Sequence, residues 1–123
     1  MLPDEKEKLL ALFDHESRWC QEAEARDAQG DAVHFDSEAA VSWDLVGGLC
    51  WLFGWGRAQE LFSQVSRSIL GRYRNTHRPD SAISAMAALV DFNDEPSTNF
   101  ATILTKLQDL PVARRHSPLP GLL

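Results

Sequence analysis

The sequence predicts a mainly α-helical protein, a compact bundle of about five helices with a small β-hairpin or irregular insertion between the first two. Apolar residues recur every three or four positions through most of the chain, which is the spacing of an α-helix. The composition, 44% hydrophobic and 24% charged residues, is ordinary for a soluble globular domain. A length of 123 residues suffices for one domain with a real hydrophobic core.

The first helix is expected from Asp4 to about Arg18. Asp4 and Glu7 have the spacing of a capping box, with aspartate in the place of serine or threonine. The apolar stripe that follows them has helical spacing and consists of Leu9, Leu12 and Phe13.

The segment Trp19–Val33 interrupts the helical pattern. Its middle is a turn-like sequence in which Gly30 suits a position with positive φ. Residues 19–21 and 32–35 flank this turn, and we expect them to pair as a short hairpin. A lone hairpin is marginally stable in water, so it is expected to pack on the helices.

The second helix is expected to begin at Asp36 or Ser37, because both residue types are good N-caps. Its apolar face consists of Val41, Leu45, Gly48, Leu49 and Leu52. The pair Gly47–Gly48 costs about 1 kcal/mol per glycine relative to alanine, so we expect another backbone to approach it closely. The sequence Gly54–Gly56 then breaks the helix, and residues 57–70 form the predicted third helix.

A polar joint is expected between the fourth helix, residues 81–91, and a fifth helix capped by Thr98. The joint consists of Phe92, Asn93, Asp94 and Thr98. Asparagine and aspartate side chains satisfy free backbone groups at such places. Loss of Asp94 is therefore expected to loosen the packing of the fourth helix against the fifth.

Residues 1–110 are expected to form the single helical domain, and residues 111–123 a proline-rich tail that cannot continue a helix. No apolar run reaches the roughly 18 residues that a membrane span needs, and no secretory signal is visible. Two cysteines are too few for a disulfide framework. These observations favour a cytoplasmic location and no membrane contact.

The net charge of −6 is unevenly distributed. Residues 1–50 hold twelve acids and four bases, a charge of −8, whereas residues 51–123 hold six acids and eight bases, a charge of +2. An acidic protein is repelled by the phosphate backbone, so direct nucleic-acid binding is not expected.

Several short sequence blocks, in a particular order along the chain, carry a family resemblance: Trp19–Gln21 followed by Ala25–Val33, then Ala39–Leu49, then Phe92–Asp94. In this order they resemble a family of small bacterial proteins of unknown function. That family has a W-[CT]-x-[GE]-A…D-x-x-G-x-x-V hairpin, a helix ending in G-[AG]-[LIV] and a [WF]-N-D joint. The resemblance covers roughly residues 5–110. It implies no established activity, cofactor or catalytic residue.

Three side chains are candidates for chemistry: Cys20, His34 and Asp94. A nucleophilic cysteine needs a lowered pKa, whereas Cys20 follows a predicted helix C-terminus, where the dipole disfavours a thiolate. We therefore favour an inert buried Cys20, a surface His34 and a structural Asp94. Many members of the resembled family carry a cysteine just before the glycine pair, and Asp44 stands there in this chain, which argues against a scheme with a second thiol. The histidine spacing predicts no metal site, and no cofactor is expected.

Trp51 and Trp55 predict an interface. They lie four residues apart, so on a helix they share one face, and Trp51 lies off the main apolar stripe. An exposed aromatic patch marks a contact surface for a protein partner or a second copy of the chain.

These observations favour a non-enzymatic helical module that binds another protein or itself, although they leave the question of an enzyme open. One alternative is a small enzyme or ligand-binding protein that uses Cys20, His34 and Asp94 in one pocket. The other is an acidic phage or mobile-element protein that inhibits a nucleic-acid-binding complex.

Overall fold

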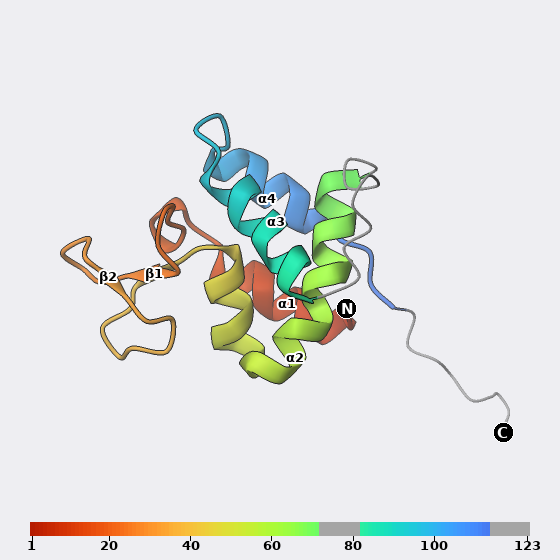
Figure 1. Cartoon of the computed structure of the whole chain (residues 1–123), viewed down its shortest axis with the longest axis horizontal. Coiled ribbons are helices and arrows are strands. Elements are labelled where there is room, and N and C mark those ends of the chain that lie inside the picture. Colours follow the sequence, from red (N-terminus) through yellow and green to blue (C-terminus); the bar gives the residue numbers. More distant parts are fainter. Residues whose placement is uncertain (72–81, 114–123) are drawn as a thin grey trace, which may run out of the picture.

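The structure is a computed structural model that describes residues 1–71 and 82–113 (Figure 1). Its helices in these ranges are α1 (Pro3–Leu12), α2 (Leu45–Leu70), α3 (Ala82–Asp94) and α4 (Phe100–Gln108). Between α1 and α2 lie a short 3₁₀-helix and three two-residue strands: η1 (Glu16–Arg18), β1 (Ala25–Arg26), β2 (Ala32–Val33) and β3 (Ser42–Trp43). The predicted mainly α class is confirmed. The predicted start at Ser81 and the tail beyond Ala113 fall outside the described residues.

The predicted count of five helices is wrong, because the described residues contain four. The expected second and third helices form one element, α2. The expected break between them exists as a kink at Gly54, whose φ of 82° and ψ of 159° are not helical. A residue with a Cβ rarely adopts this backbone conformation, so glycine permits the kink.

The start of α2 also differs from the prediction. Its N-cap is Asp44 rather than Asp36 or Ser37. The backbone N–H of Asp44 donates to the carbonyl of Glu24 at 3.2 Å. This bond holds the residues before α2 against the strands, so the helix begins later in the sequence. Val41, predicted on the helix face, is instead an exposed residue of the preceding loop.

The first and last helices are shorter than the sequence suggests. The helix α1 ends at Leu12 instead of Arg18, because the chain leaves helical geometry at Phe13 and buries that ring completely. The N-cap of α4 is Asn99, whose Oδ1 accepts from the N–H of Thr102 at 2.9 Å. The predicted cap, Thr98, is a buried residue one position earlier.

The three strands form a small antiparallel sheet in the order β2-β1-β3. Ala25 pairs with Val33 on one side and with Trp43 on the other. The predicted turn is present, with Gly30 at a φ of 88°, but the first arm of the hairpin is 25–26 rather than 19–21. We call residues 19–44 the hairpin lobe, which projects from one side of the helices (Figure 1).

The core lies between α2 and the other helices, and α2 packs most extensively on α3. Its largest fully buried apolar side chains are Phe13, Phe62, Leu9, Leu45, Leu49, Leu61, Leu89, Ile103, Leu107 and Val65. None of the described helices combines the length and the apolar character that crossing a bilayer demands.

The expected close approach at the glycine pair is confirmed. A Cβ on Gly47 would lie 2.0 Å from the carbonyl oxygen of Glu24, and a Cβ on Gly48 would lie 2.7 Å from Cζ of Phe13. The first contact joins α2 to the hairpin lobe, and the second joins α2 to the end of α1. The two glycines therefore let the first turn of α2 pack against both segments.

We expect Gly47→Ala to destabilise the protein by about 3 kcal/mol, because the new methyl group meets a backbone carbonyl that cannot move independently. Gly56→Ala is the matched control, since nothing lies within 4 Å of its added Cβ. The control is expected to be neutral or up to about 1 kcal/mol more stable. Urea unfolding measures both changes, and equal stabilities for the two variants would contradict this account of the pair.

Candidate functional site

The side chain of Asn93 lies at the centre of the most connected polar cluster that the structure describes. Asn93 is in the last turn of α3 and is fully buried. Its Oδ1 accepts from Nε1 of Trp19 at 2.8 Å and from the backbone N–H of Leu45 at 3.1 Å. Its Nδ2 donates to the carbonyl of Cys20 at 3.0 Å and to Oδ1 of Asp94 at 2.9 Å. All the donors and acceptors of this amide are used, which is the condition for burying it without a large penalty.

Gln21 and Glu22 extend this cluster along the backbone. Nε2 of Gln21 donates to the carbonyl of Asn93 at 3.0 Å, so it satisfies an acceptor at the end of α3 that has no partner within the helix. The backbone N–H of Glu22 donates to Oδ1 of Asp94 at 2.9 Å. Glu22 has a φ of 65°, an uncommon value for a residue with a side chain, and this bond helps to hold it there.

Asp44 caps α2 beside the same cluster. Its carboxylate accepts from the N–H of Gly47 at 2.5 Å, and only 3% of Asp44 is exposed. Burial raises the pKa of Asp44 from 3.8 to about 7, and the nearby charges of Asp94 and Glu24 add to the rise, while the bond from Gly47 opposes it. Near neutral pH this buried carboxyl group therefore exists in both protonation states.

The cluster brings together the blocks that carry the family resemblance. Trp19, Cys20 and Gln21 come from the first block, the start of α2 from the second, and Asn93 and Asp94 from the last. Each block supplies hydrogen bonds that position the other two. The joint also includes Phe92, which is partly buried against the core.

The structure brings Cys20 and Asp94 together but places His34 in a different group. Burial raises the pKa of the Cys20 thiol to about 11, and the charges of Asp44 and Asp94 contribute, although a hydrogen bond with Ser42 lowers it. His34 lies on the exposed side of the lobe, where its ring contacts the carboxylates of Glu24 at 3.6 Å and Asp36 at 2.5 Å.

No group of three or more metal-binding side chains that could hold an ion occurs within residues 1–71 and 82–113. The other cysteine, Cys50, is buried on α2, and burial raises the pKa of its thiol to about 11 as well.

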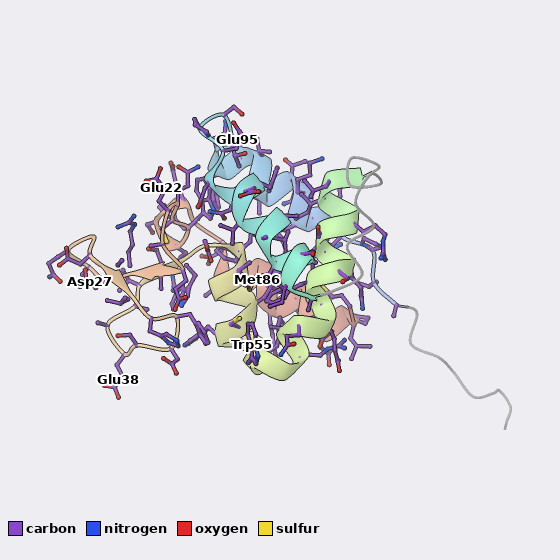
Figure 2. The ribbon with its side chains drawn as sticks, in the orientation of Figure 1. Glu22, Asp27, Glu38, Trp55, Met86 and Glu95 are labelled. Carbon is purple, nitrogen blue, oxygen red and sulfur yellow. The ribbon has the colours of Figure 1, made fainter. Side chains whose placement is uncertain are left out.

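Trp51 and Trp55 lie on opposite sides of the kink in α2, so the helical spacing that predicted a shared face does not apply to them. Each ring is anchored separately. Trp51 stacks on Trp43 with ring centroids 5.0 Å apart, and Trp55 meets the edge of Phe62 with centroids 6.0 Å apart. Both nevertheless stay about half exposed, at 46% and 48%. Figure 2 shows Trp55 where the ribbon of α2 bends.

Sequence reasoning missed the roles of Asp44 and Gln21. A signal for Asp44 existed, because an aspartate directly before the apolar run Leu45–Val46 is a typical N-cap. The role of the Gln21 side chain carried no signal, since the carbonyl groups to which it donates lie more than 70 residues away in the chain.

Residues 7–110 match a protein family described as a family of unknown function (DUF6197). The chain belongs to this family. The match confirms the resemblance drawn from the sequence blocks. The comparison with curated proteins and the comparison with solved structures produced no significant match.

Asp44→Asn tests the buried carboxyl group. The folded protein holds this proton up to about pH 7, whereas the unfolded chain releases it near pH 3.8, so wild-type stability falls as the pH rises between these values. Asparagine caps a helix as well as aspartate and does not titrate. As the pH rises through this window, the free energy of unfolding of the variant is therefore expected to increase relative to wild type by about 1.4 kcal/mol per pH unit, a few kcal/mol in all.

Urea unfolding from pH 4 to pH 8 measures this gain. Asp109→Asn, at an exposed carboxylate, is the matched control and is expected to run parallel to wild type. A curve for Asp44→Asn that also ran parallel to wild type would contradict the proposed titration.

Proposed function

We propose that this protein is a non-enzymatic protein-binding module that docks a partner, another protein or a second copy, through Trp51 and Trp55. The observation that carries the proposal is the half exposure of two tryptophans that sit next to one kink in α2. Most large apolar residues within residues 1–71 and 82–113 are buried or partly buried, and tryptophan is strongly enriched among the residues that dominate binding energy at interfaces.

The anchoring of the two rings supports this role. Trp51 rests on Trp43, whose own Nε1 donates to the carbonyl of Phe35 at 2.9 Å, and Trp55 rests on the fully buried Phe62. A ring that is already held in place loses little conformational entropy when a partner covers it. Anchored and exposed rings are therefore suited to binding.

The alternative of a small enzyme with Cys20, His34 and Asp94 in one pocket has less support. With a pKa of about 11, only about one Cys20 thiol in ten thousand is ionised at pH 7, and the thiolate is the nucleophilic form. The contacts of His34 are with Glu24, Asp36 and Phe35, so they give the thiol no base.

The double variant Trp51→Ser/Trp55→Ser tests the proposal. Its matched control is Leu2→Ser/Val112→Ser, which removes two other exposed apolar side chains, 44% and 42% exposed. Light scattering on the full chain measures self-association, and affinity capture from the source cells identifies any other partner. The partner so identified is then purified and titrated against all three proteins.

We expect the tryptophan variant to weaken binding, or self-association, at least about tenfold, which corresponds to about 1.4 kcal/mol. The control is expected to bind within about twofold of wild type. Thermal unfolding verifies that both variants remain folded. A partner that binds the tryptophan variant as tightly as wild type would contradict the proposal. A wild-type protein that is monomeric in light scattering and captures no other protein would contradict it as well.

A further inference from the structure

The hairpin lobe carries a net charge equal to that of the whole protein. Residues 19–44 contain seven acids and one arginine, a charge of −6, and the remaining residues contain eleven acids and eleven bases. Five of the seven acids are exposed: Glu22, Glu24, Asp31, Asp36 and Glu38. In Figure 2, Asp27 and Glu38 lie at the outer edge of the lobe, away from the helices. The charge asymmetry seen in the sequence is therefore a property of one projecting element.

This acidic lobe adjoins one of the exposed tryptophans. Trp51 stacks on Trp43 of β3, and Trp43 donates a hydrogen bond to the carbonyl of Phe35. The N–H of Phe35 in turn donates to a carboxylate oxygen of Glu24 at 2.9 Å. The residue after Phe35 is Asp36, which is exposed. These contacts connect the exposed ring of Trp51, through the buried Trp43 and through Phe35, to the carboxylates of Glu24 and Asp36. We call Trp51 and these neighbouring acidic residues, with Glu38, the Trp51 seam.

We propose that the Trp51 seam docks a basic protein surface, one in which an apolar side chain lies among lysines and arginines. This inference rests on the proposed function and names the chemistry of the partner. The apolar side chain covers the ring of Trp51, and the cations face Glu24, Asp36 and Glu38. A lysine or arginine that lies over the indole ring is further attracted by a cation–π interaction.

Charge complementarity favours such a partner over a second copy of this chain. A symmetric dimer through Trp51 places the same surface patch of both copies face to face, and therefore brings two lobes of charge −6 together. Like charges that meet at an interface oppose association. A basic partner instead gains attraction at long range, which speeds its encounter with the lobe at low ionic strength.

The test uses three defined probes, labelled amphipathic helical peptides of the same length. The first combines leucine and lysine, the second replaces leucine by glutamine, and the third replaces lysine by glutamate. Fluorescence anisotropy measures their binding to the full-length protein at about 50 mM and about 300 mM salt, a range over which charge screening increases strongly.

Three variants accompany the probes. Asp36→Lys/Glu38→Lys reverses two exposed charges of the lobe, and Asp14→Lys/Asp109→Lys makes the same change in net charge at exposed sites outside it. Trp51→Ser removes the ring. Thermal unfolding verifies the fold of each variant.

The leucine–lysine peptide is expected to bind best, and at least about tenfold more weakly at the higher salt concentration. Asp36→Lys/Glu38→Lys and Trp51→Ser are each expected to weaken the binding of this peptide at least about tenfold. Asp14→Lys/Asp109→Lys is expected to change its affinity less than about threefold. Equal losses from the two charge reversals would mean that only net charge matters, and would overturn the inference. Unchanged binding to Trp51→Ser would overturn it as well.

Two further results separate this inference from the proposed function. A basic partner would be refuted if the leucine–lysine peptide failed to bind, or if the leucine–glutamate peptide bound equally well. Either result would leave the proposed function open, because the capture experiment with the Trp51 and Trp55 variants tests that function separately. A dimer that depends on Trp51 would support the proposed function while replacing the basic partner by a second copy.

Discussion

The buried amide of Asn93 is the constraint on which the hairpin lobe depends. One side chain bonds the indole of Trp19, the carbonyl of Cys20 and the first amide of α2 at Leu45. An isolated bridge between Trp19 and Trp43 also joins two of these segments, but the sheet of the lobe consists of two-residue strands. A small sheet of this kind has little stability of its own. Its position is therefore fixed by polar contacts to the end of α3 and by the close approach at Gly47.

The sequence predicts the helices well where apolar periodicity alone decides them, as in α4 and the second half of α2. It also predicts the close packing at Gly47–Gly48 and the turn at Gly30. The start of α2 is ambiguous in the sequence, because Asp36, Ser37 and Asp44 are all good caps by residue type. The choice of Asp44 follows from its bond to Glu24, which exists only once the lobe has folded. Hydrogen bonds between residues far apart in sequence leave no local pattern.

The blocks that carry the family resemblance and the surface proposed for binding occupy different parts of the molecule. The blocks meet inside, where Trp19 and Asn93 hold the lobe to the helices. The proposed contact surface lies outside, on Trp51, Trp55 and the acidic edge that includes Glu38. Buried joints explain the fold, and function is carried by the site that the fold presents. In this protein the joint keeps the lobe beside Trp51, so the two parts are physically connected through Trp43.

Native-state hydrogen exchange in Asn93→Ala tests the central role of this amide most directly. The amides of Glu22 and Leu45 are expected to lose protection by about a hundredfold or more, about 3 kcal/mol, and by more than the amide of Ile103 in α4. Asn99→Ala, the matched control at the cap of α4, is expected to affect the amide of Thr102 and spare the other two. Unchanged protection at Glu22 and Leu45 in Asn93→Ala would contradict the account.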